Sequence, residues 1–165
     1  MRGWVADVEG GGNSNFRTVE TEAARKAQLF TSTNVWVDSA PYISGGMSET
    51  GSFLLLDVPP GNITISFAAP GAPDARLILQ NVPGNADVFV GGLILKKEGV
   101  DFADPEAVQV RSAAHIDKPH PNGRFAIVAG RKIPIVDTPI AQLTERHDFP
   151  TPPARQGQAP LATVK

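Results

Sequence analysis

The stretch from Ser48 to Phe67, SETGSFLLLDVPPGNITISF, decides the expected fold. Gly51 precedes an apolar run, residues 59–62 (Pro-Pro-Gly-Asn) form a reversal, and apolar residues then alternate with Thr64 and Ser66. Alternation at a period of two is typical of a strand that buries one face. Prolines and glycines in the reversal are typical turn residues. The stretch therefore predicts a half-buried pair of antiparallel strands.

The chain on either side of this stretch, up to residue 97, also alternates short strand-forming runs with loops. Short runs of strand-forming residues lie at 3–8, 34–38, 75–79, 86–90 and 93–96, and Gly- and Asn-rich loops separate them. Six or seven strands at spacings of about 8 to 12 residues predict a sandwich or a barrel. Residues 21–30 are rich in helix formers, and they predict either a short helix or an extended surface loop.

The composition agrees with an all-β fold and excludes some functions. Sixteen glycines and fifteen prolines among 165 residues favour short strands and turns over long helices. The net charge of −2, without a basic stripe, argues against nucleic acid as a partner. The chain has no cysteine, which excludes thiolate catalysis, and no apolar run of the ~20 residues that a membrane span needs.

After Lys97 the strand-forming runs become fewer and the chain ends in a proline-rich segment. Residues 108–111 predict an edge strand, and residues 124–136 predict a small hairpin whose second arm contains Pro134. A proline cannot donate a hydrogen bond to a neighbouring strand, so we expect this arm at a sheet edge. From Phe149 onwards the chain is rich in proline and poor in core-forming residues, which predicts an extended tail.

Residues 3 to about 97 resemble the carboxypeptidase regulatory-like domain, a transthyretin-like β-sandwich. The matching segments are Gly3-Trp4-Val5, Asn34-Val35-Trp36-Val37, Gly51-Ser52-Phe53, and the run from Val58 to Ile65. The resemblance implies a seven-stranded antiparallel β-sandwich over residues 1–97, with the Pro-rich extension at residues 98–165 outside it. In such a sandwich we expect Phe53, Leu55, Ile63, Ile65 and Phe67 to form the inter-sheet core, with alternate residues pointing inward.

The same resemblance implies a non-catalytic module in an extracellular or periplasmic protein, without a conserved ligand site. The beginning of the chain, Met1-Arg2-Gly3, does not read as a signal peptide, so this location rests on the resemblance. We find no Gly-x-Ser-x-Gly nucleophile motif, and we expect a protein that is not an enzyme and needs no cofactor.

Potential metal ligands cluster at His115 and His120, with Asp117 between them. Two imidazoles and a carboxylate could hold a transition metal, but their spacing matches no standard motif, and solvated loop histidines are the favoured alternative. Asp101, Asp104 and Glu106 offer oxygen ligands for calcium, but an ordinary polar turn around Asp104 is the favoured explanation. We therefore assign no metal site, and His115 and His120 stay weak candidates.

Two kinds of partner remain open. Strand edges and the C-terminal extension predict association with protein, either this chain itself or other envelope components, through Phe125, Ile127, Ile133 and Ile135. The alternative is a carbohydrate- or ligand-binding accessory module, for which Tyr42 in the loop after Pro41 is the candidate residue. A structural and assembly module is the leading hypothesis. It predicts that deleting residues 98–165 leaves a folded core and abolishes association.

Overall fold

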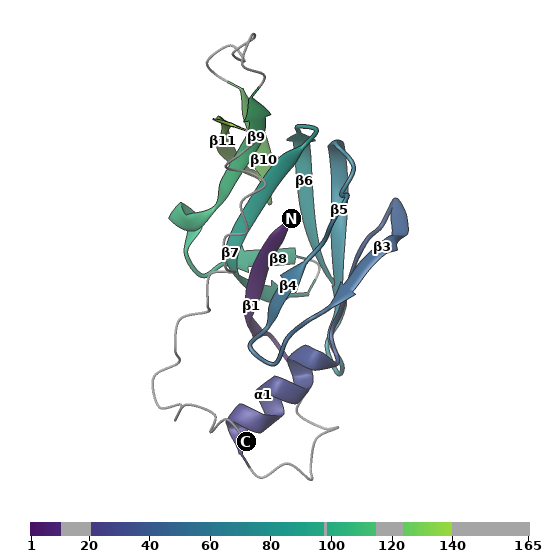
Figure 1. Ribbon diagram of the computed structural model, residues 1–165. Coiled ribbons are helices and arrows are strands. Elements are labelled where there is room, and N and C mark those ends of the chain that lie inside the picture. The colour runs from purple at the N-terminus through teal and green to yellow at the C-terminus, as the bar shows by residue number, and fades with distance from the viewer. Residues whose placement is uncertain (11–20, 98, 115–123, 140–165) are drawn as a thin grey trace, which may run out of the picture.

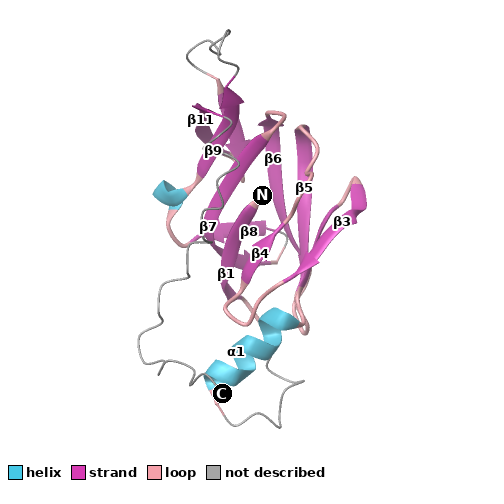
Figure 2. Cartoon of the chain, viewed as in Figure 1, coloured by secondary structure: helices cyan, strands magenta, loops and turns pink. Residues whose placement is uncertain are grey.

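The computed structural model describes residues 1–10, 21–97, 99–114 and 124–139. These ranges contain one α-helix, α1 (Glu22–Thr31), a short 3-10 helix, η1 (Pro105–Ala107), and eleven strands (Figure 1). The strands are β1 (Arg2–Val8), β2 (Asn34–Val37), β3 (Ala40–Gly46), β4 (Ser52–Leu54), β5 (Gly61–Ala68), β6 (Ala75–Val82), β7 (Ala86–Lys96), β8 (Gly99–Phe102), β9 (Gln109–Ala114), β10 (Phe125–Val128) and β11 (Arg131–Pro139). Strands dominate the molecule, as Figure 2 shows, and the expected all-β class is confirmed.

All eleven strands belong to one hydrogen-bonded sheet. Their order is β3-β2-β5-β6-β10-β11-β9-β7-β1-β4, and β8 pairs with β7 outside this path. Two neighbouring pairs, β1 with β7 and β9 with β11, run parallel. The predicted seven-stranded antiparallel sandwich is therefore wrong: the described chain forms a single rolled sheet of mixed direction (Figure 1).

The difference arises from strands that follow residue 97. Strands β6 and β7 are consecutive in the chain, yet β10, β11 and β9 lie between them in the sheet. Strand β10 pairs with β6, β9 pairs with β7, and β11 joins β10 to β9. The described part of the C-terminal extension thus completes the sheet begun by residues 1–97. It links the half made of β3, β2, β5 and β6 to the half made of β7, β1 and β4.

The stretch from Ser48 to Phe67 contains the two expected strands, but they do not pair with each other. Strand β4 pairs with β1, whereas β5 pairs with β2 and β6. The segment between them carries the chain from one half of the sheet to the other, and on this path the amide of Leu55 donates to the carbonyl of Met1 at 2.8 Å. The predicted antiparallel pair within this stretch is wrong for that reason.

The two end strands of the sheet, β3 and β4, approach each other without forming a ladder. A methyl group added at Gly45 of β3 would lie 3.3 Å from the carbonyl oxygen of Leu54 in β4. The chain turns between the two strands at residues 48–51, where Ser48 N donates to Ser52 O at 3.0 Å. The rolled sheet is therefore nearly closed at this side.

Gly51 is required at the end of this turn. Its φ of +84° lies in the region that side chains with a Cβ rarely adopt, and an added Cβ would lie 2.5 Å from the carbonyl oxygen of Val5. Its own carbonyl accepts from Val5 N at 2.9 Å. The glycine thus allows the turn to lie directly against β1.

The interior of the rolled sheet is filled by alternate residues of both halves. All five residues expected in the core are buried, and Ile65 and Phe67 have no exposed surface. The rings of Phe53 and Phe67 meet edge to face with centroids 5.3 Å apart. The extension contributes to the same interior, since Val110, Ala126 and Val128 are also fully buried.

Residues 22–31 form a helix, which decides between the two expected alternatives. The Thr21 hydroxyl caps it by accepting from Ala24 N at 3.2 Å, and Leu29 and Phe30 anchor its last turn in the core. Within the described ranges, no helix has the length and apolar character that crossing a membrane requires.

The hairpin expected between residues 124 and 136 is present as β10 and β11. Ala129 and Gly130, both with positive φ, make its two-residue turn. Pro134 does not lie in an edge strand, because β11 has β10 on one side and β9 on the other. The proline is tolerated since the pairing with β9 begins only at Ile135. Strand β9, expected at an edge, likewise lies between β11 and β7.

Candidate interaction surfaces

Six large apolar side chains are exposed among the described residues, and they mark the surfaces that are open to a partner. Three of them, Ile78, Phe125 and Val136, come from β6, β10 and β11, which are neighbours in the sheet. The other three are Tyr42, Leu54 and Leu56. Single exposed apolar residues are ordinary, but a contiguous group marks an interaction site.

The first three belong to one outer face, as the register shows. Phe125 lies opposite Pro134, and Ile127 lies opposite both Lys132 and Gln80. Residues two apart on a strand share a face, so Val136 continues from Pro134, and Ile78 continues from Gln80. We call this group the β10 patch and define it as Ile78, Phe125, Ile127, Pro134 and Val136.

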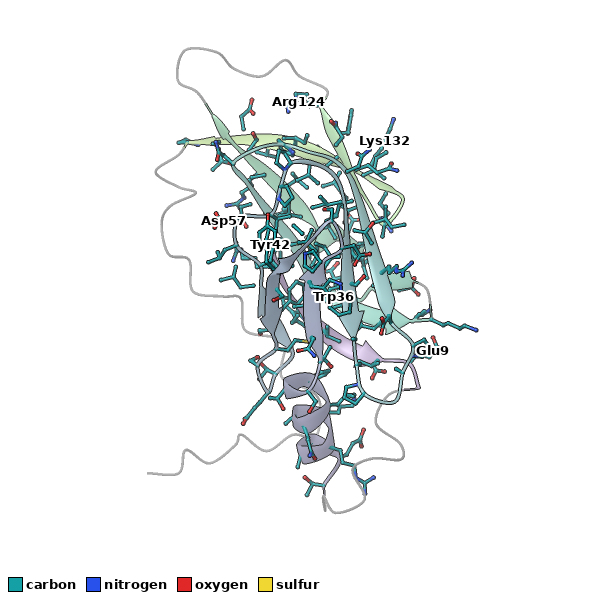
Figure 3. All side chains as sticks on the ribbon, turned by 90° about the vertical axis from the view of Figure 1, so that its right-hand side faces the viewer. Glu9, Trp36, Tyr42, Asp57, Arg124 and Lys132 are labelled. Atoms are coloured by element: carbon teal, nitrogen blue, oxygen red, sulfur yellow. The ribbon has the colours of Figure 1, made fainter. Side chains whose placement is uncertain are left out.

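Positive charge borders the β10 patch. The Lys132 ammonium lies over the Phe125 ring, 5.4 Å from its centroid, and Arg131 is exposed beside it. Arg124 precedes β10, and Arg111 lies opposite Val136 in the register of β9 and β11. Arg124 and Lys132 are labelled at the upper end of the molecule in Figure 3. A partner on this face therefore meets apolar surface inside a cationic border.

Of the four residues expected to serve assembly, two face outward and two face the core. Phe125, with 40% of its surface exposed, and the half-buried Ile127 face outward in β10. Ile133 is buried in the chain's own core, and Ile135 packs against that core. Sequence reasoning found this hairpin by its alternation, but it could not tell which face of each strand points out.

Tyr42 lies in strand β3 rather than in a loop, and 86% of its surface is exposed. The register between β2 and β3 shifts from Trp36 opposite Ser44 to Val37 opposite Ala40, so residues 41–43 form a bulge in the edge strand. Bulges of this kind redirect side chains and end ladder pairing. Here the bulge presents the tyrosine ring to solvent.

Trp36 lies on the same side of the sheet as Tyr42 (Figure 3). It is half-buried and points away from the interior, because its neighbours Val35 and Val37 are fully buried. Ser44 and Ser66 flank it on β3 and β5. The Ser66 hydroxyl donates to Asp38 Oδ1 at 2.5 Å. The alternation Val-Trp-Val was the signal in the sequence that could have found this arrangement.

A second cluster, on the outside of β1 and β7, combines two aromatic rings with an ion pair. The Arg2 guanidinium donates to both carboxylate oxygens of Asp87 at 3.2 and 3.1 Å and lies 5.3 Å from the centre of the Phe89 ring. The Trp4 ring contacts Phe89 at a centroid distance of 5.8 Å. These contacts join β1 to β7 and explain why Trp4 is half-buried on the outside.

The Met1 ammonium lies beside this group in a buried position. It donates to the carbonyl oxygen of Leu55 at 2.8 Å. Burial lowers the pKa of the ammonium below its usual value of 8.0, and the negative charge of Asp87 opposes part of this effect. The amine therefore loses its proton more readily in the folded chain.

The candidate metal ligands of the sequence do not come together in the described residues. His115 and His120 lie outside the described ranges. Asp101 pairs with Lys96, and the Asp104 carboxylate accepts from Glu106 N at 3.2 Å as the cap of η1. Within the described ranges, no group of three His, Asp or Glu side chains is arranged to hold a metal ion.

Comparison with protein-family models found no matching family, and comparisons with curated protein sequences and with solved structures also found no match.

Proposed function

We propose that this chain is a structural module that associates with further copies of itself through the β10 patch. The observation that carries the proposal is that exposed apolar side chains of three neighbouring strands share one outer face, and two of these strands belong to the C-terminal extension. Removing such a patch from water is the main driving force of protein association. The proposal assigns the chain no catalytic role.

The strand edges contribute less to this association than the sequence suggested. Edge strand β3 carries Pro41 and a bulge, and β4 and β8 are short. Short, bulged and proline-containing edges resist pairing with another chain. The proposal therefore places the contact on the outer face of β6, β10 and β11 instead of on an edge. The resemblance to the carboxypeptidase regulatory-like domain, and the extracellular or periplasmic location that it implies, are kept as predictions.

Sedimentation velocity of the full chain over a concentration series tests the proposal. We expect concentration-dependent association of the wild-type chain and a monomer for Phe125→Asp, because a carboxylate in the apolar contact would lose its water without gaining a partner. Leu56→Asp is the matched control, since Leu56 is an equally apolar residue, 67% exposed, outside the patch. A wild-type monomer at every concentration, or equal disruption by Leu56→Asp, would refute the proposal.

A further inference from the structure

The outer face of β2, β3 and β5 carries polar and aromatic groups together. We call it the Trp36 cluster and define it as Trp36, Asp38, Tyr42, Ser44 and Ser66. Figure 3 looks onto this side of the molecule, with Tyr42 and Trp36 labelled near its middle. The Trp36 cluster contains no aliphatic side chain, and this composition distinguishes it from the β10 patch.

The register of three strands places the members of the cluster on one outer face. Trp36 lies opposite Ser44 on one side and Ser66 on the other. Ser44 therefore shares the outer face of Trp36, and Tyr42, in the bulge of β3, has 86% of its surface in solvent. Two aromatic rings from adjacent strands therefore project from one side of the sheet, with hydroxyl groups beside them.

The carboxylate of Asp38 is held over this face. Its Oδ1 accepts from the Ser66 hydroxyl at 2.5 Å, and Asp38 N donates to the carbonyl oxygen of Thr64 at 3.0 Å. Ser66 is buried although it belongs to an outer row, so its hydroxyl fixes the carboxylate and is itself shielded from solvent. Asp38 is exposed, and its Oδ2 makes no hydrogen bond with the described part of the chain. That oxygen is free to accept from a ligand.

We propose that the Trp36 cluster binds a neutral carbohydrate chain. The apolar face of a sugar ring stacks on an aromatic face, whereas its hydroxyl groups need acceptors such as a carboxylate and donors such as a serine hydroxyl. The cluster supplies both kinds of contact on an open surface, where successive sugars of a chain can lie side by side. A partner made of apolar side chains would leave Asp38 Oδ2 without water or a hydrogen-bond partner.

The charges around the cluster select a neutral sugar. Asp38 is negative, and Arg76 lies opposite Ser66 on the neighbouring strand β6. A uronic acid would bring a carboxylate close to Asp38, where like charges repel. The exposure of Tyr42 agrees with a binding role, because a ring with 86% of its surface in water contributes little to the folded core.

Titration of the full chain with soluble hexasaccharides tests the inference. The probes are cellohexaose, mannohexaose and hexa-N-acetylchitohexaose as neutral chains, and hexagalacturonate as the anionic comparison. Binding is measured by calorimetry and by tryptophan fluorescence in a Trp4→Phe background, in which Trp36 is the remaining reporter. We expect at least one neutral chain to bind with a Kd below about 5 mM and hexagalacturonate to bind at least about tenfold more weakly.

Substitutions identify the surface that binds. Tyr42→Ala and Asp38→Ala should each weaken binding by about tenfold or more, whereas Tyr42→Phe, which keeps the ring, should retain it. Leu56→Ala is the control for an exposed residue outside the cluster. The inference is overturned if no neutral probe binds at about 5 mM, if hexagalacturonate binds as well as the neutral chains, or if Tyr42→Ala and Asp38→Ala leave binding unchanged.

Discussion

The rings of Phe53 and Phe67 lie edge to face, 5.3 Å apart, although their strands β4 and β5 share no backbone hydrogen bond. They meet across the interior of the rolled sheet, from the two halves that the C-terminal extension links. This contact therefore reports directly on how the two halves face each other.

Replacing either ring should destabilise the protein strongly. We expect Phe53→Ala and Phe67→Ala each to lower the free energy of unfolding by about 3–5 kcal/mol, because both side chains are buried. In a double-mutant cycle the two changes should couple by about 0.5–1.5 kcal/mol. Urea denaturation measures these values. Phe125→Ala is the control, and additivity of the two core substitutions would show that the rings do not meet.

Substitution of Gly51 should also destabilise the protein, because the backbone at this position has no room for a side chain. Gly51→Ala places a methyl group 2.5 Å from the backbone oxygen of Val5 at a φ of +84°, so the turn must move away from β1. We expect a loss of about 2 kcal/mol or more. Gly46→Ala is the matched control, because nothing lies within 4 Å of its added Cβ. Equal denaturation midpoints for the two variants would contradict this view of the turn.

The extension should be part of the folding unit. Val128 is fully buried beneath the pairing of β10 with β6, whereas Phe125, three residues earlier in the same strand, faces outward. We expect Val128→Asp to abolish cooperative unfolding and Phe125→Asp to leave the melting transition of the monomer nearly unchanged, since only the first buries an unpaired carboxylate. Circular dichroism during heating separates the two.

Deleting residues 98–165 should likewise unfold the chain or make it aggregate. The deletion would leave β6 and β7 unpaired at the edges that β10 and β9 normally cover. This expectation replaces the one drawn from the sequence, in which residues 1–97 remained folded alone. A shortened chain that melts cooperatively would restore the sequence interpretation.

Local features of the fold could be predicted from the sequence, but the pairing of distant strands could not. The alternation of Ile63, Ile65 and Phe67 identified a buried face, and the helix formers of residues 21–30 indicated a helix as one of two alternatives. Nothing in residues 48–67 shows that β4 pairs with β1, because backbone hydrogen bonds carry no sequence signature. The hairpin of β10 and β11 was found by its turn and alternation, yet its place between β6 and β9 depends on the closure of the whole sheet.

For the candidate surfaces, too, single residues could be predicted from the sequence, but their neighbours from distant strands could not. Tyr42 stood out because it follows Pro41 and lies near glycines, and the structure does expose it. Its neighbours on the face were missed, since Asp38 and Ser66 are 28 residues apart and meet only when β2 pairs with β5. The outward direction of Trp36 was readable from Val35 and Val37.

The buried amine of Met1 predicts a pH dependence of stability. Burial lowers its pKa in the folded chain below the unfolded value of 8.0, so the unfolded chain binds more protons between these two values. The free energy of unfolding should therefore fall as the pH decreases from 8.0 towards the folded pKa, and level off above 8.0. Chemical denaturation between pH 7 and 9 of the chain with a free Met1 amine measures this. Stability that is constant or higher at pH 7 would contradict it.

Salt should strengthen the proposed association between copies. The β10 patch is bordered by Lys132, Arg131 and Arg124, and two copies that meet through this face bring like charges together. Raising the ionic strength from about 0.01 to 0.15 M shortens the Debye length from about 30 to 8 Å and screens this repulsion. We expect the dimer dissociation constant to fall, and Lys132→Gln to produce the same change at low salt. Sedimentation equilibrium measures both. An association that weakens with salt would mean that the cationic border meets negative charge, and the contact would then involve a different face of the second copy.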